Sequence, residues 1–220
     1  MKTTSVAAAP GNTLGGVLTA SVATGAGAGS VDWSYSVANA ATQSLSDGQI
    51  VTENFTVTIA DGHGGTVNQL ITVTITGTND APTVTAQTPA SVAEGAAALT
   101  VDALASASDV DLNDTLSVVN VQAVLPAGVT YNAGTHSFTL DPSNAAYNSL
   151  AVTEQTQVTV NYEVSDGIAS VPTSITFTVT GTNDAPTVSA HTDGALSEDA
   201  TDPTLSTSGT ITFDDADLSD

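Results

Sequence analysis

The chain has 220 residues, which is enough for one large domain or two of ordinary size. It carries 23 acidic residues and one basic residue, Lys2, so its formal net charge at pH 7 is −22. Because phosphate groups are neutralised by many cations, this charge argues strongly against nucleic acids and anionic membrane surfaces as partners. Cysteine is absent, which excludes disulfides, thiolate catalysis and cysteine-ligated metals, and no apolar run approaches the roughly 18 residues of a membrane span.

Hydrophobic and polar side chains alternate in several segments along the chain, and turn residues such as Asp61-Gly62 and Asp166-Gly167 separate them. The alternating segments are 31–37, 55–59, 71–75, 160–164 and 175–179. A period of two places one row of side chains in a core and the other in water, which is typical of antiparallel strands. No segment sustains a helical period. Seven or so short strands in about 100 residues predict an all-β chain of immunoglobulin-like antiparallel β-sandwiches.

An internal repeat organises the chain. Residues 75–84 (ITGTNDAPTV) recur almost unchanged at 179–188, so Asn183 follows Asn79 by 104 residues. The period predicts three repeats: a partial sandwich at 1–78, a complete one at 79–182 and the N-terminal part of a third at 183–220. We expect the third segment to be ordered only when it docks on a neighbour.

The acids that recur with this period lie outside the predicted strands, at the joints and in loops. Two carboxylates about 4 Å apart repel by roughly 4 kcal/mol at an effective dielectric constant of about 20, and the chain has almost no basic side chains to relieve them. Oxygen ligands without histidine or cysteine are those that Ca²⁺ prefers, and Mg²⁺ fits less well. The segment 109–120 is not an EF-hand loop, because Asp114 stands where that loop needs glycine and Asn120 where it needs glutamate.

Each acidic motif also has a simpler interpretation. The loop at 109–114 is then a solvated acidic loop, Asn79-Asp80 is a turn and linker before Pro82, and Asp166-Gly167 is a tight turn. The sequence alone leaves both interpretations open.

The joint motif Thr-Gly-Thr-Asn-Asp-Ala-Pro, the Asp61–Thr66 turn and the stretch Ser208–Asp214 resemble the VCBS and cadherin-like repeats of very large, RTX-type bacterial surface adhesins. The resemblance implies a tandem array of calcium-binding sandwiches that extends an adhesin outside the cell, with neighbouring repeats of the same chain as partners. By this analogy the metal ligands are Asn79, Asp80, Glu94, Asp109, Asp111, Asp166, Asn183, Asp184, Glu198, Asp215 and Asp217.

The sequence contains no recognisable catalytic set. The histidines His63, His136 and His191 do not recur with the period, and the chain has no Gly-x-Ser-x-Gly elbow. We therefore expect no enzymatic activity in these residues. Two alternatives to a calcium-stiffened extender remain: a module that binds a cell-surface glycan or protein, and a non-catalytic spacer of an extracellular enzyme. The first is disfavoured because the few aromatic residues fall on predicted core rows, among them Trp33.

Overall fold

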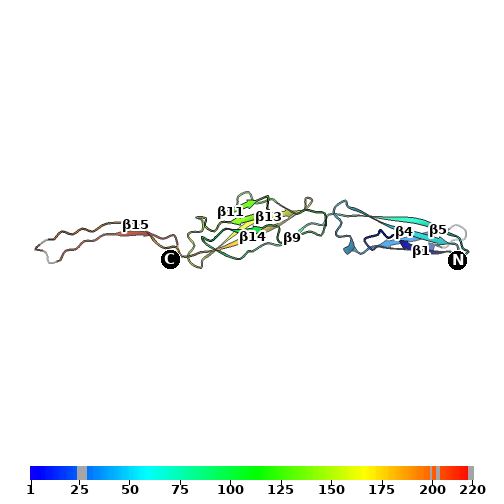
Figure 1. Cartoon of the computed structure of the whole chain (residues 1–220), viewed down its shortest axis with the longest axis horizontal. Coiled ribbons are helices and arrows are strands. Elements are labelled where there is room, and N and C mark those ends of the chain that lie inside the picture. Colours follow the sequence, from blue (N-terminus) through cyan, green and yellow to red (C-terminus); the bar gives the residue numbers. More distant parts are fainter. Residues whose placement is uncertain (24–28, 199, 202–203, 218–220) are drawn as a thin grey trace. The chain divides into compact units, whose positions relative to one another are not determined.

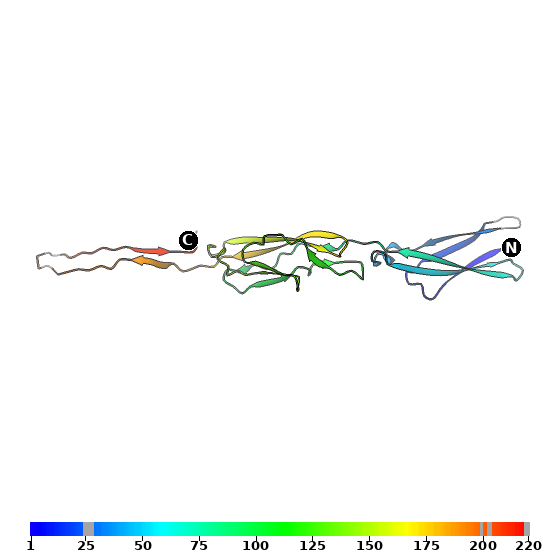
Figure 2. The same ribbon diagram turned by 90° about the horizontal axis from the view of Figure 1, so that it is seen from above.

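The computed structural model describes residues 1–23, 29–198, 200–201 and 204–217. Apart from one 3-10 turn, η1 (Asn39–Ala41), its regular elements are strands, which confirms the predicted all-β fold (Figures 1 and 2). The chain divides into two compact units. Unit 1 comprises Met1–Thr83, Ala107–Ser117 and Ser165–Val171, and unit 2 comprises Val84–Ser106, Val118–Val164 and Pro172–Asp220. The three repeat boundaries deduced from the sequence stay a prediction.

Unit 1 is built from a three-stranded antiparallel sheet and a hairpin. The sheet has the order β1-β4-β5, and the hairpin joins β2 to β3. The bounds are β1 (Thr3–Ala8), β2 (Val17–Ala23), β3 (Ser30–Ser36), β4 (Ile50–Ala60) and β5 (Thr66–Thr76). The predicted segments 55–59 and 71–75 lie in β4 and β5, where threonines dominate the opposite face and β-branched side chains fit the pleat. Segment 31–37 lies in β3 up to Ser36, but the prediction that Trp33 belongs to the core row is wrong, because its side chain is 50% exposed.

The core of unit 1 contains a buried carboxylate. Phe55 on β4 is buried, and Glu53, two residues earlier in the same row, has no exposed surface. Its carboxylate accepts hydrogen bonds from the backbone N–H groups of Leu14 (2.8 Å) and Gly16 (3.0 Å) and from the Tyr35 hydroxyl (2.8 Å). Burial, together with the hydrogen bond and charge of Glu53, raises the pKa of Tyr35 to about 12. Three donors thus compensate the desolvation of this carboxylate.

Unit 2 contains a four-stranded sheet, β10-β13-β14-β7, and a three-stranded sheet, β11-β12-β8. Two further short strands, β6 and β9, pair with each other in a separate two-stranded sheet. β9 and Thr83 of β6 belong to unit 1. The bounds are β6 (Thr83–Val84), β7 (Val92–Ala93), β8 (Leu99–Asp102), β9 (Ala107–Ser108), β10 (Ser117–Val119), β11 (Val129–Asn132), β12 (Ser137–Leu140), β13 (Gln155–Ser165) and β14 (Ser170–Thr180).

Aromatic side chains fill the core of unit 2. Phe138 and Phe177 have no exposed surface, and Tyr162 is almost fully buried. The ring centroids of Phe138 and Tyr162 lie 5.3 Å apart, and the Tyr162 hydroxyl donates to the carbonyl oxygen of Ala103 (2.8 Å). The buried hydroxyl is therefore satisfied, and the predicted alternation of β13 and β14 holds.

The last described strands of unit 2 form a hairpin, β15 (Thr187–His191) with β16 (Ile211–Asp214), which contains a register shift between Val188 and Ala190. Every residue of both strands is exposed, including Ile211 and Phe213. A part of the third predicted repeat thus pairs with itself and leaves apolar side chains uncovered.

Candidate metal centre

Asn79 and Asp80 follow β5 through a glycine at which the backbone passes close to a neighbouring segment. A side chain at Gly77 would collide with the carbonyl oxygen of Leu45, so only glycine fits this path. The Gly77 N–H donates to the carbonyl oxygen of Gln49 (2.8 Å) and fixes the segment. This backbone contact holds the start of the joint motif in place.

The loop at 109–114 folds around its own aspartates. The Asp111 N–H donates to Asp109 Oδ1 (3.0 Å), and the Asp114 N–H donates to the Asp111 carbonyl oxygen (3.3 Å). The Asp111 side chain is only 3% exposed, and its Oδ2 accepts the Asp80 N–H (2.8 Å). The loop is also tied to the first predicted repeat, because the Asn113 amide donates to Gln49 Oε1 (3.0 Å).

Asp166 closes the cluster from the turn after β13. Its Oδ2 accepts the Asn79 amide (3.0 Å), and its Oδ1 accepts the N–H groups of Ile168 and Ala169 (both 2.7 Å). Burial alone would raise the pKa of Asp166, but these hydrogen bonds to the charged form outweigh it and hold the pKa below its ordinary value. The carboxylate is therefore kept ionised.

The oxygens of this cluster converge without enough donors to satisfy them. One carboxylate oxygen each from Asp109, Asp114 and Asp166 lie within 4.8 Å of one another. Buried oxygens without a hydrogen-bond partner are Asn79 Oδ1, Asp109 Oδ2, Asp111 Oδ1 and Asp114 Oδ2. Buried polar atoms are normally paired, so this arrangement, made entirely of oxygen ligands, fits a hard divalent cation.

Asp114 is the one member of this cluster that was absent from the predicted ligands. The signal for it was in the repeat: Asp114 follows Asp111 by three residues, as Asp220 follows Asp217. Residue 220 lies outside the described part of the chain. Asp80 takes part through its backbone N–H, while its side-chain Oδ2 accepts the Gln43 amide (3.4 Å).

A second cluster in unit 2 repeats this scaffold. The Asp184 N–H donates to Asp217 Oδ2 (2.9 Å), the Asp217 N–H donates to Asp215 Oδ1 (3.0 Å), and the Asn183 amide donates to the Asp184 carbonyl oxygen (2.9 Å). These bonds are the counterparts of those at Asp80, Asp111, Asp109 and Asn79 in unit 1. Asp217 is buried, and its Oδ1 has no hydrogen-bond partner.

Glu94 belongs to the second cluster. Burial raises the pKa of its carboxyl; the Thr182 N–H, 3.4 Å from Oε2, opposes this shift, and the charges of Asp184 and Asp217 add to it. A nearby cation would therefore favour the ionised form of Glu94. Its counterpart by spacing, Glu198, is exposed, and no described contact joins it to another predicted ligand.

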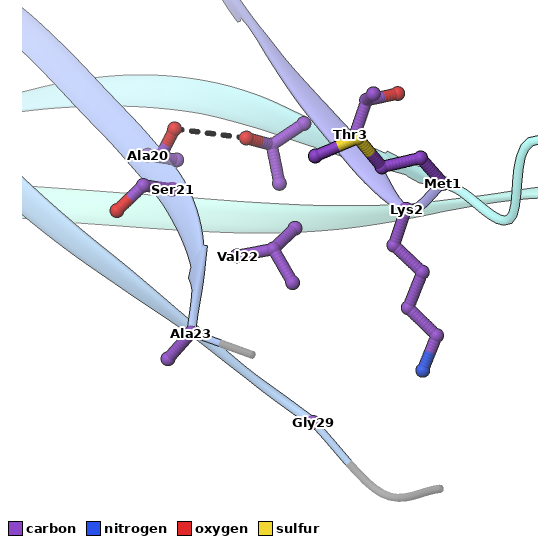
Figure 3. A pocket seen from close by; sticks show the side chains of 9 residues that line it. Met1, Lys2, Thr3, Ala20, Ser21, Val22, Ala23 and Gly29 are labelled. Atoms are coloured by element: carbon purple, nitrogen blue, oxygen red, sulfur yellow. Dashed lines mark hydrogen bonds between the residues drawn. The ribbon is translucent and has the colours of Figure 1, made fainter. Parts of the chain in front are cut away.

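A separate cleft of about 610 Å³ lies in unit 1 between β1 and β2 (Figure 3). Small and aliphatic residues such as Ala20 and Val22 line it, with Lys2 beside them, and the Thr4 hydroxyl donates to the Ala20 carbonyl oxygen (2.8 Å). None of its described lining residues belongs to either acidic cluster.

Comparison with known proteins bears on the fold. Residues 78–180, slightly under half of the chain, match the family model of the cadherin-like domain. This part of the chain has a cadherin-like fold. No curated protein sequence matches the chain, and the described residues form no helix long and apolar enough to cross a bilayer.

Several solved structures resemble the chain at low identity. A human CDH23 fragment, EC21–23, is 17% identical with a TM-score of 0.41, and the match covers 77% of this chain and 55% of that one. The fragment PcdhgB3 EC1–4 is 13% identical with a TM-score of 0.49, covering 98% and 50%. An endo-fucoidan hydrolase of glycoside hydrolase family 107 is 15% identical with a TM-score of 0.35, covering 86% and 33%. The chain thus spans between about a third and just over half of these structures.

Proposed function

We propose that this chain is a calcium-binding extender segment of an extracellular adhesin of the bacterial surface, in which Ca²⁺ at the repeated acidic clusters stiffens the joints. In this proposal the 220 residues act by spacing and adhesion and carry no catalytic centre. The observation that carries the proposal is the set of buried, unpaired oxygens in the first cluster, from Asn79, Asp109, Asp111 and Asp114.

Charge supports a cation there. Burying carboxylates without a compensating charge is costly, and the chain offers one basic side chain in total. The hydrogen bonds that fix Asp111 and Asp166 come from neutral amide groups, which orient the carboxylates and leave their charge uncompensated. A divalent ion would supply that compensation.

The candidate ligands, which are Asp, Glu and Asn side chains, favour calcium over other common metal ions. All candidate ligands are carboxylate or amide oxygens, whereas typical zinc sites include histidine nitrogen or cysteine sulfur ligands even where a carboxylate takes part. In unit 1 the ligands would be the side chains of Asn79, Asp109, Asp111, Asp114 and Asp166. In unit 2 they would be those of Glu94, Asp184, Asp215 and Asp217, with Asn183 beside them.

Extracellular calcium concentrations suit such sites. Extracellular modules bind calcium with dissociation constants of about 10⁻⁴–10⁻³ M. At ten times the dissociation constant, each ion adds roughly 1.4 kcal/mol of stability. Several ions along an array would therefore order it outside the cell and leave it looser where calcium is scarce.

The test compares melting temperatures with excess calcium and with chelator. We expect calcium to raise the melting temperature of the unchanged chain, and Asp111→Asn and Asp217→Asn each to remove part of that increase. The matched control is Asp32→Asn, which removes one exposed carboxylate outside both clusters. With chelator, Asp111→Asn should be at least as stable as the unchanged chain, because it relieves repulsion.

Calorimetric titration with CaCl₂ counts the ions. A melting temperature that calcium leaves unchanged, or an Asp111→Asn chain that responds to calcium as the unchanged chain does, contradicts the proposal.

A further inference from the structure

The beginning and the end of the cadherin-like part of the chain are bonded directly to each other. β7, near its beginning, lies parallel to the end of β14, with Val92-Ala93 opposite Val179-Thr180. Further towards the N-terminus, Gln87 forms an isolated parallel bridge with Ile175, which is fully buried on β14. The segment that enters this part of the chain therefore runs alongside the strand by which the chain leaves it.

The two pairings are separate attachment points. Between them, residues 88–91 face residues 176–178, so the entering segment has one residue more than β14 has. An extra residue on one strand is typical of a β-bulge, which interrupts the ladder. Pro89 lies in this stretch and has no N–H to donate. The bridge at Gln87 therefore holds its end of the segment without help from the residues that follow it.

Gln87 is hydrogen-bonded to both sheets of unit 2. Its N–H donates to the Ser174 carbonyl oxygen, and its carbonyl oxygen accepts the Thr176 N–H (both 2.9 Å), which attaches it to β14. Its side-chain amide donates to the carbonyl oxygens of Asp102 (3.0 Å) and Ala103 (3.3 Å), at the end of β8 in the other sheet. One residue thus fixes the entering segment to both sheets.

The direction of the paired strands decides how they respond to tension. Both strands of a parallel pair run the same way, so tension that enters before Gln87 and leaves after Thr180 pulls them past each other. The hydrogen bonds of such a pair are evenly spaced along it, so this shear loads them together and not one at a time. Strands β8 to β13 lie between the two points in the sequence, and they carry little tension until the pair separates.

We propose that this pair, together with the Gln87 bridge, is a mechanical clamp that lets the cadherin-like part of the chain bear tension along its length. The proposal rests on the extender function, because a segment that links the two ends of an adhesin carries the tension between them. Forced unfolding is governed by the unfolding rate. The contacts that must break first on the path of the load, those of Gln87 and β7, therefore set the resistance of this part of the chain.

The first experiment stretches the full chain between two cysteines in optical tweezers, in chelator. The natural chain has no cysteine, so substitutions at exposed positions place the two handles. Thr78→Cys with Thr182→Cys loads the clamp in shear, whereas Ala97→Cys with Thr182→Cys peels it from the end at which β7 and β14 both finish. We expect an unfolding force about twofold or more higher in shear, because the bonds are then loaded together. Equal forces in the two directions overturn the proposal.

The second experiment tests whether Gln87 belongs to the clamp. Gln87→Ala removes the side-chain bonds to the end of β8 and should raise the rate of forced unfolding in shear about tenfold. Peeling starts at the other end of the pair, so its rate should change by less than about twofold. Gln157→Ala is the matched control, because it removes an exposed glutamine on β13.

Two outcomes of the second experiment would overturn the role of Gln87. In the first, Gln87→Ala unfolds in shear at the rate of the Gln157→Ala control. In the second, Gln87→Ala speeds unfolding equally in shear and in peeling, which would show that the residue stabilises the fold in general and does not act on the path of the load.

The clamp and the calcium function can fail independently. Among the described residues of the clamp, Glu94 alone is a predicted calcium ligand, and it takes part through its N–H, which donates to the Thr180 carbonyl oxygen (2.8 Å) and needs no ion. If calcium leaves the melting temperature unchanged while shear stays stronger than peeling in chelator, the calcium function fails and the clamp stands. If calcium raises the melting temperature while the two forces are equal, the clamp fails and the calcium function stands.

Discussion

The two units use the same strand arrangement and fill it differently. The core of unit 2 contains packed aromatic rings, among them those of Phe138 and Tyr162. Unit 1 buries the Glu53 carboxylate where unit 2, 105 residues further along the chain, has the buried Val158, and it leaves Trp33 half exposed. The arrangement therefore tolerates a buried carboxylate when local donors satisfy it, and a half-exposed aromatic side chain at a position where unit 2 buries one.

Trp33 on β3 and Phe138 on β12 lie 105 residues apart, the spacing that also separates the starts of β4 and β13. The largest expected difference between the units is the cost in stability of removing these two equivalent aromatic side chains. Phe138→Ala should lower the free energy of unfolding of unit 2 by about 3–5 kcal/mol, because it leaves a cavity among buried rings. Trp33→Ala should cost unit 1 less than about 1.5 kcal/mol, since half of that side chain already contacts water. Urea unfolding at low protein concentration measures both, and equal costs would contradict the comparison.

An intermediate effect is expected at the buried carboxylate of unit 1. Glu53→Ala leaves the N–H groups of Leu14 and Gly16 and the Tyr35 hydroxyl without their acceptor. We expect a loss of about 1–3 kcal/mol. Glu53→Gln keeps the shape and one acceptor oxygen, so it should lose less, and a urea unfolding series that ranks the two in the opposite order would refute this role.

The smallest expected difference is in the pH dependence of the two acidic clusters in chelator. The pKa of Glu94 is raised above 4.5, so its contribution to stability falls as pH rises from the ordinary Glu range through the folded pKa. The pKa of Asp166 is lowered below 3.8, so its contribution is present above the ordinary Asp range and is lost as pH falls through the folded pKa.

The unchanged chain should lose stability at Glu94 as the pH rises, and Glu94→Gln should abolish that loss. It should lose stability at Asp166 as the pH falls, and Asp166→Asn should abolish that second loss. Urea unfolding between about pH 3 and pH 6 distinguishes the two slopes. Slopes of the same sign for both variants would show that the clusters do not differ in this way.

The alternation of hydrophobic and polar residues was sufficient to predict the long strands. The segments 55–59 and 175–179 lie in β4 and β14, because in both a buried row of large apolar residues opposes a row of threonines. The short strands, such as β7 and β9, were not individually predictable, since two residues carry no period.

The repeat predicted which acids recur, and the structure brings most of them together. Sequence reasoning did not include Asp114, because its position facing Asp109 and Asp166 depends on how the loop folds. Nor could it foresee that Glu53 is buried, because its donors at Leu14 and Gly16 are backbone groups of a loop far away in sequence. Hydrogen bonds from loop backbone groups do not depend on which side chains the loop carries, so no sequence pattern predicts them.

The second cluster has a consequence for how such a gene can change in length. Glu94 and Asp184 are 90 residues apart in the sequence, and by the predicted boundaries the cluster draws on two successive repeats. Recombination that adds or deletes one whole period of 104 residues leaves every such pair in step. An insertion or deletion of another length between Glu94 and Asp184 would shift the glutamate relative to its aspartates, so length changes close to whole periods are those that keep the cluster intact.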